Sequence, residues 1–185
     1  DNELFGRLPW AVAGVVLTTF LVLAVVFRSL VLPLKATLLN TLSVLAAYGF
    51  LVLVFQDGVG ASWIGLDPPG GLNSFVVLML FTILFGLSMD YEVFLLSRVR
   101  EEYLASGDNA RAVALGLGRT AGIITSAALL MISIFVSFGF TNLVPTREFG
   151  LGLAFAVALD ATLIRVVLVP ALMAVSGRWN WWLPG

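Results

Sequence analysis

The chain has 185 residues, of which 60% are hydrophobic and 11% are charged, with a mean hydropathy of +1.05. Soluble domains carry about 25% charged residues, so this composition indicates a membrane protein. The net charge of −1 and the absence of Cys and His exclude nucleic-acid binding through a basic surface, disulfides, thiol or imidazole catalysis and the usual zinc sites.

Five stretches are long enough to cross a bilayer, because about 20 apolar residues span its ~30 Å hydrocarbon core. In chain order, the predicted spans are residues 9–28, 32–55, 73–97, 119–140 and 148–175. The loop 56–72 contains Pro68-Pro69-Gly70-Gly71, through which no helix continues. Residues 98–118 form a second long connection, which we expect on the cytosolic side, with Asp108 as the N-cap of a short surface helix. The predicted fold class is therefore all-α, a polytopic membrane bundle of five transmembrane helices.

Lys and Arg are divided unevenly between the two ends of these spans. Seven lie on one side: Arg28, Lys35, Arg98, Arg100, Arg111, Arg119 and Arg178. Arg7 and Arg147 lie on the other side, and Arg165 lies inside the fifth span. The positive-inside rule therefore predicts a plasma-membrane protein with its N-terminus outside and its C-terminus in the cytosol. A chain that begins outside needs an upstream segment, so we expect the C-terminal piece of a larger polytopic protein.

The third span contains two carboxylates, Asp90 and Glu92, in an otherwise apolar run. An ionisable group there costs at least ~2.5–3.5 kcal/mol and by default marks a functional site facing the bundle interior. Side chains two positions apart point about 200° away from each other, so at most one of them faces the interior. The alternative interpretation is that both mark the helix end and extend to the cytosolic headgroups. The apolar turn Val93–Leu96 that follows argues against this alternative for Asp90.

At these residues the chain resembles a known family. The segment FGLSMDYEVFLLSRVREEY (85–103) is similar to the signature of the MmpL family (mycobacterial membrane protein, large) of the resistance–nodulation–division (RND) superfamily of exporters. Three other stretches agree: FRSLVLPLKATLLNTLSVLAAYG (27–49), NSFVVLMLFTILFGLSMDY (73–91) and GLAFAVALDATLIRVVLVPALM (152–173). The resemblance covers essentially the whole chain. It implies helices eight to twelve, half of an RND-type twelve-helix transporter, with a porter domain just before Asp1.

The resemblance also implies a function. In that family an Asp-Tyr pair on helix ten meets a second pair on helix four, and the cluster relays protons. Carried onto this chain, the helix-ten pair is Asp90-Tyr91, and the helix-four pair lies in the missing N-terminal repeat. The implied activity is proton-motive-force-driven export of lipids or other hydrophobic metabolites. Two carboxylates in a low dielectric do not easily both ionise, so protons enter and leave in coupled steps that can move one repeat against the other.

The last two spans contain four further candidate residues that could support the relay together with Glu92. Thr125 and Ser126 lie where the superfamily often keeps a hydroxyl near the relay, although Ser and Thr also satisfy helix carbonyls without any function. Asp160 and Arg165 lie in the fifth span. Five positions apart on an α-helix they diverge by about 140°, so a direct pair is predicted to be strained. A structural ion network with other helices is as good an interpretation of these two residues as a relay role.

Other classes of function remain as alternatives. A non-transporting membrane sensor or scaffold is the main one, because the sterol-sensing fold is related to this bundle. An intramembrane aspartyl protease is disfavoured, since the order is Asp-Tyr and no G-x-G-D accompanies Asp160. No ATP-binding P-loop motif occurs, and we expect no enzymatic activity, no cofactor and no metal. The expected partners are the lipid bilayer, the N-terminal repeat and porter domain, and a hydrophobic substrate.

Overall fold

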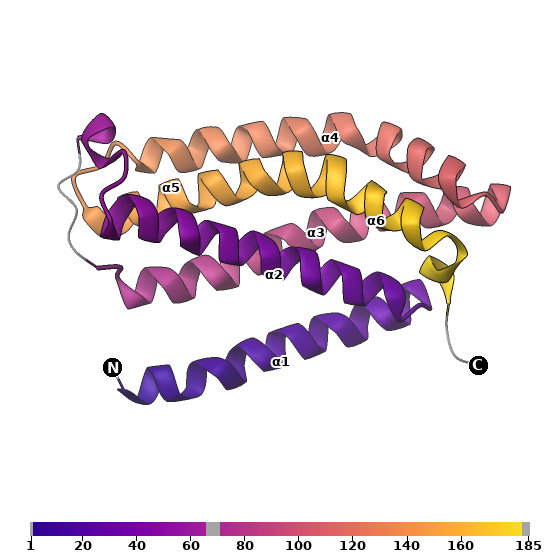
Figure 1. Cartoon of the computed structure of the whole chain (residues 1–185), viewed down its shortest axis with the longest axis horizontal. Helices are drawn as coiled ribbons and strands as arrows, with labels where there is room; N and C mark the ends of the chain where they lie inside the picture. The colour runs from indigo at the N-terminus through magenta and orange to yellow at the C-terminus, as the bar shows by residue number, and fades with distance from the viewer. Residues whose placement is uncertain (1, 66–70, 183–185) are drawn as a thin grey trace.

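The computed structural model describes residues 2–65 and 71–182, with the side chains of residues 10, 12–62, 65 and 71–182. Within these residues the chain makes five helical passes that alternate in direction (Figure 1) and contains no strand. The helices are α1 (Asn2–Phe27), α2 (Val31–Leu51), α3 (Ser74–Ser106), α4 (Asn109–Phe138), α5 (Val144–Leu159) and α6 (Val169–Ser176). Shorter elements are the π-helix η1 (Val52–Gln56), the 3-10 helix η2 (Ala61–Ile64), the π-helix η3 (Asp160–Leu168) and the 3-10 helix η4 (Gly177–Trp181). The predicted all-α class is confirmed.

Four passes are long and apolar enough to cross a membrane: Val31–Gln56, Ser74–Ser106, Asn109–Phe138 and Val144–Trp181. The last of these joins α5, η3, α6 and η4 into one continuous pass. The first pass, α1, is 26 residues long, and its apolar part within the described residues, Val12–Phe27, is shorter than the other four. These helices confirm a polytopic membrane bundle.

The connection predicted for residues 98–118 differs from the observed one. α3 continues as a helix to Ser106 and α4 begins at Asn109, so only Gly107 and Asp108 separate them. The expectation of a separate short surface helix is therefore wrong, because the helix that begins at Asn109 continues without a break to Phe138. Gly107 ends α3 at a positive φ of 69°, which glycine adopts without strain. The predicted N-cap is confirmed, since the Asp108 carboxylate accepts hydrogen bonds from the N–H groups of the second and third residues after it.

The α3–α4 hairpin projects beyond the other helices (Figure 1). At 1.5 Å per residue, the 33 residues of α3 extend for about 50 Å and the 30 residues of α4 for about 45 Å. Both lengths exceed the ~30 Å hydrocarbon core, so one end of this hairpin lies outside the membrane.

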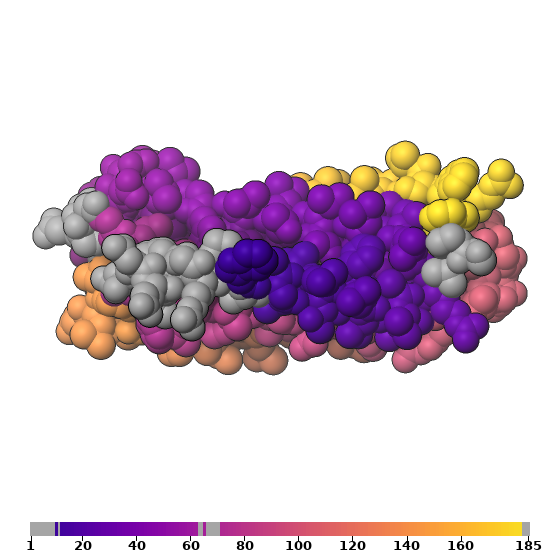
Figure 2. Space-filling model, turned by 90° about the horizontal axis from the view of Figure 1, so that it is seen from below, coloured from indigo at the N-terminus to yellow at the C-terminus, as the bar shows by residue number. Residues whose placement is uncertain are grey.

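The passes differ in how deeply they are packed. The last pass contacts α2, α3 and α4, and two of its glycines allow close approaches to these helices. A Cβ at Gly152 would lie 2.5 Å from Leu80 Cδ1 of α3, and one at Gly150 would lie 2.5 Å from Phe138 Cβ of α4. α1 packs mainly against α2 and lies on the surface of the bundle, as Figure 2 shows. Its exposed apolar side chains, such as Val25 at 76%, suit a lipid-facing helix.

One end of the bundle, here called the basic end, contains the α1–α2 turn, the α3–α4 turn and η4 (Figure 1). Its basic residues are the seven named above, from Arg28 to Arg178. Asn180 of η4 is fully buried there and connects the ends of several helices. Its backbone carbonyl accepts a hydrogen bond from Ser29 Oγ at 2.6 Å, and its Nδ2 donates to the Met173 carbonyl at 2.7 Å. The ring of Trp181 stacks on Tyr103 of α3 with centroids 4.5 Å apart.

Candidate functional site

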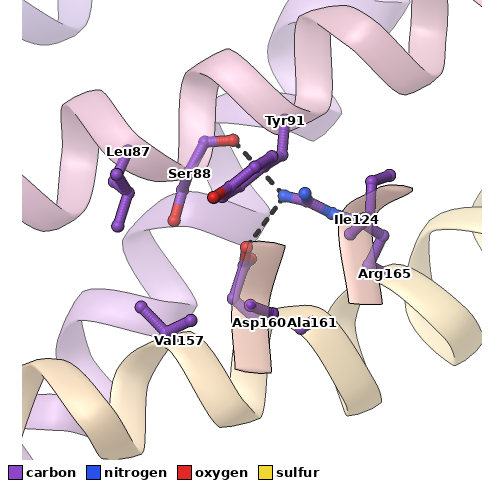
Figure 3. A pocket seen from close by; sticks show the side chains of 9 residues that line it. Leu87, Ser88, Tyr91, Ile124, Val157, Asp160, Ala161 and Arg165 are labelled. Atoms are coloured by element: carbon purple, nitrogen blue, oxygen red, sulfur yellow. Dashed lines mark hydrogen bonds and ion pairs between the residues drawn. The ribbon is translucent and has the colours of Figure 1, made fainter. Parts of the chain in front are cut away.

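The two charged residues of the last pass form a direct ion pair. Arg165 Nη2 donates to Asp160 Oδ2 at 2.8 Å, and both side chains are buried (Figure 3). The prediction that this pair would be strained is wrong because it assumed α-helical geometry. Residues Asp160–Leu168 form a π-helix, whose i→i+5 hydrogen bonds bring residues five apart onto the same side. π-helical turns inside α-helices occur frequently at functional sites.

α3 supplies the other contacts of Arg165. Its Nη2 also donates to the backbone carbonyl of Ser88 at 3.3 Å. The guanidinium carbon lies 5.1 Å from the ring centroid of Tyr91, a cation–π contact. The Tyr91 hydroxyl in turn lies 3.2 Å from Met131 Sδ on α4. Figure 3 shows the side chains of Tyr91 and Asp160 converging on Arg165 from two different helices. The buried pair is therefore attached to α3 and, through Tyr91, to α4.

A cavity of about 10 Å³ adjoins this pair, which is room for about one water molecule. Its lining residues come from α3, α4 and the last pass: Leu87, Ser88, Tyr91, Ile124, Ala128, Val157, Asp160, Ala161 and Arg165 (Figure 3). Arg165 Nη1 is buried and makes no hydrogen bond within the described part of the chain. The site thus has a buried donor beside a space large enough for a small polar molecule.

The two carboxylates of α3 point in different directions, as their spacing predicts. Asp90 is exposed on the outside of this bundle, whereas Glu92 is buried with 5% exposure. Glu92 lies within electrostatic reach of Arg165 and Asp160. Glu92 is therefore a buried residue of the bundle and does not extend to the headgroup region, whereas Asp90 lies on the outside of the bundle.

The MMPL family matches residues 7–184 of the sequence.

The chain belongs to the MMPL family.

Its whole length aligns at 46% identity with the heme uptake protein MmpL11 of Mycobacterium tuberculosis (strain ATCC 25618 / H37Rv) and at 45% with the mycolic acid-containing lipids exporter MmpL11 of Mycolicibacterium smegmatis (strain ATCC 700084 / mc(2)155). It is 37% identical over 99% of its length to the trehalose monomycolate exporter MmpL3 of Mycobacterium tuberculosis (strain CDC 1551 / Oshkosh). The chain spans 19% of the length of each of these relatives. The resemblance to the MmpL family is confirmed.

The hydroxyl residues predicted on α4 of this MMPL chain are not part of the buried site. Thr125 and Ser126 are both exposed, and Ser126 Oγ donates to the backbone carbonyl of Ile123 at 3.0 Å. In the described bundle, the Ser126 hydroxyl therefore bonds to a backbone carbonyl of its own helix, as expected for a residue without a functional role. The structure brings Tyr91, Asp160 and Arg165 together, buries Glu92, and leaves Asp90, Thr125 and Ser126 exposed.

Two ionisable residues of the MMPL chain were not recognised as candidates from sequence. Glu148 is 1% exposed, and its Oε2 accepts a hydrogen bond from the backbone N–H of Asn73 at 3.2 Å, which connects the last pass to the start of α3. Lys35 is half-buried in α2, and among the described residues its hydrogen bonds go to neutral acceptors. Lys35 could have been recognised from its position inside a predicted span, where a charged side chain costs free energy. Within the described residues, no group of three or more acidic residues is placed to hold a metal ion.

Proposed function

We propose that this chain is the C-terminal transmembrane part of a proton-driven transporter and that Asp90 and Tyr91 carry its protons. The observation that carries the proposal is the position of Asp90, a carboxylate near the middle of a membrane-spanning helix that the bundle leaves exposed. In hydrocarbon such a group costs several kcal/mol, so it requires another protein surface or a proton. The relatives are long enough to contain further helices that could provide such a surface, since this chain spans only 19% of their length.

The surface around Asp90 is suited to close helix contact. Met79, Thr82, Gly86 and Asp90 follow one another at helical spacing on the exposed side of α3 and are here called the Asp90 face. A Cβ at Gly86 would meet no atom within 4 Å, so this side of α3 is open in the bundle. Small and polar residues allow helices to approach closely in membranes. We propose the N-terminal repeat of the same protein as the partner of this face, with the chain contributing helices eight to twelve.

Tyr91 connects the Asp90 face to the buried ion pair, because its ring packs on Arg165 while the preceding residue, Asp90, faces outward. When Asp90 loses its proton, its attraction to polar or charged groups of the facing repeat changes. A change of this kind shifts the balance between two arrangements of the repeats. The transmembrane potential contributes about 2.3 kcal/mol per charge per 100 mV, enough to bias such an equilibrium.

The names of the relatives support the transport function. Two of them are named as exporters of mycolic acid-containing lipids or trehalose monomycolate, and one is named as a heme uptake protein. All three cargoes have large apolar parts. We therefore propose a lipid or another hydrophobic metabolite as the cargo, and a plasma-membrane location with the basic end in the cytosol.

The test is the substitution Asp90→Asn in the full-length protein. Asn keeps the shape of the side chain but cannot titrate, so we expect proton flux and cargo export to be lost while membrane insertion and abundance stay unchanged. Glu101→Gln is the matched control, since Glu101 is an exposed carboxylate on the same helix, paired with Arg98 at 2.7 Å. Wild-type export by Asp90→Asn would overturn the relay. A wild-type protein that moves neither protons nor lipid would favour the membrane sensor.

A further inference from the structure

A second water-sized cavity lies between the Asp160–Arg165 pair and the basic end. Its volume is about 10 Å³, enough for about one water molecule. The lining residues come from α2, α3 and the last pass: Leu32, Lys35, Leu39, Glu92, Leu96, Val169, Leu172 and Met173. Only two of them ionise, and Lys35 and Glu92 are oppositely charged when both are ionised. The cavity therefore lies between the acid and the base in otherwise apolar surroundings.

Lys35 has no acidic partner among its hydrogen bonds within the described residues. Its Nζ donates to the Leu172 carbonyl at 3.0 Å, to Ser176 Oγ at 2.5 Å and to Asn180 Oδ1 at 2.5 Å. All three acceptors are neutral, so none of them compensates the ammonium charge. Across the cavity, Glu92 is the other ionisable lining residue, and its carboxylate has the sign opposite to that of the ammonium. In surroundings of low dielectric constant, opposite charges separated by one water molecule attract each other far more strongly than in bulk solvent.

Glu92 is the buried acid that the proposed Asp90–Tyr91 relay leaves unused. The charged groups that face it are Lys35 from α2 and the Asp160–Arg165 pair from η3. The backbone carbonyl of Ser88 accepts a hydrogen bond from Arg165. Glu92 lies one helical turn further along α3, toward the basic end. Glu92 is thus positioned between the buried ion pair and the half-buried Lys35.

We propose that Glu92 is a further proton-binding residue of the coupling and exchanges its proton with the basic end through the cavity it shares with Lys35. The O–H bond of the protonated carboxyl breaks, and the proton passes to water in the cavity and from there to the solvent. Lys35 acts through Glu92 as a positioning residue, because its charge stabilises the carboxylate that remains. This inference rests on the proposed proton-coupled transport and adds a path from the middle of the bundle to the basic end.

The first test measures proton flux through the full-length protein in liposomes. In Glu92→Gln we expect a loss on the order of 10²-fold, the lower end of what a positioned proton-transfer group contributes. Glu92→Asp keeps a carboxyl group and should recover part of the flux, while Glu101→Gln should behave as wild type. If Glu92→Gln keeps full flux while Asp90→Asn is inactive, this inference is overturned and the proposed function stands. Full flux in both variants overturns both.

The second test does not depend on transport. Infrared spectra of the full-length protein in membranes, recorded across a pH series, report protonated carboxyl groups through their C=O stretch. We expect one titrating band to be absent in Glu92→Gln. Lys35→Met, which removes the stabilising charge, should keep that carboxyl protonated over a wider pH range, and Lys35→Arg should restore the wild-type titration. If no band is lost in Glu92→Gln, Glu92 is a structural residue and the proposal is wrong. If the band titrates identically in Lys35→Met, the positioning role proposed for Lys35 is wrong.

Discussion

Tyr91 follows the exposed Asp90 on α3, and its ring packs against the buried Arg165. The ring centroid lies 5.1 Å from the guanidinium carbon of Arg165. Tyr91→Phe keeps this ring and removes only a hydroxyl whose neighbour, Met131 Sδ, is a weak acceptor. We expect Tyr91→Phe to lower proton flux without abolishing it. Tyr91→Leu should lower it further, because a desolvated cation–π contact contributes about 2 kcal/mol. Proton flux through each variant is measured in liposomes. Full flux in Tyr91→Phe would show that the Tyr91 hydroxyl has no role and that Tyr91 is a packed aromatic residue.

The buried Asp160–Arg165 pair allows a second prediction at the same scale. Removing one member leaves an uncompensated buried charge, which costs about 3–5 kcal/mol, whereas replacing both by apolar residues is often neutral. We therefore expect Arg165→Met to lower the melting temperature of the purified protein clearly more than the double variant Asp160→Leu/Arg165→Met. Thermal unfolding in one detergent provides the comparison. If the double variant is less stable than the single one, the pair contributes more than charge compensation.

At the scale of the elements, the π-helix η3 explains why the pair forms at all. In an α-helix, residues five apart diverge by about 140°, but the i→i+5 pattern of Asp160–Leu168 aligns them. The composition of this segment predicts a helix, and it contains no residue that selects the π form. The π form depends on the surrounding helices, since the Ser88 carbonyl and the Tyr91 ring hold Arg165 from α3.

The arrangement of the connecting elements leads to a topology prediction, motivated by the seven basic residues at one end and two at the other. Gly60 and Gly107 have positive φ angles, so their exposed neighbours Ser62 and Ser106 are better sites for cysteine in this Cys-free chain. We expect Ser62→Cys to react with an impermeant maleimide in intact cells and Ser106→Cys to react only after permeabilisation. Equal labelling of both variants in intact cells would contradict the proposed orientation.

For the whole molecule, we predict that residues 1–185 alone insert into a bilayer but do not carry protons. Asp90 is exposed in the five-pass bundle, and without a second repeat it faces lipid and lacks the facing protein surface that the proposed relay requires. Liposomes containing this fragment, with an imposed pH gradient and a pH-sensitive dye inside, measure the flux. Flux above that of empty liposomes that disappears in Asp90→Asn would show that the five-pass unit is complete, for example as a homodimer.

Much of this protein could be predicted from its sequence because the hydrophobic signal is local. Long apolar stretches, the breaks between them and the capping residue Asp108 each depend on neighbouring residues, so the all-α class and the membrane passes followed directly. The extent of the α3–α4 hairpin did not follow, since the charged residues 98–106 were read as a connection although nothing in them ends a helix. The family was recognisable for the same reason, from contiguous segments such as residues 85–103.

The sequence by itself also determined that Asp90 and Glu92 face opposite ways, because helical geometry alone sets the angle between them. Only the tertiary structure decided which of the two faces inward, since that depends on where α2 and the last pass pack against α3. It also decided that Asp160 reaches Arg165, through a π-helix with contacts from a distant helix. Lys35 and Glu92 are 57 positions apart and line one cavity. Contacts of this kind depend on the packing of helices that are remote in sequence, and no local pattern records them.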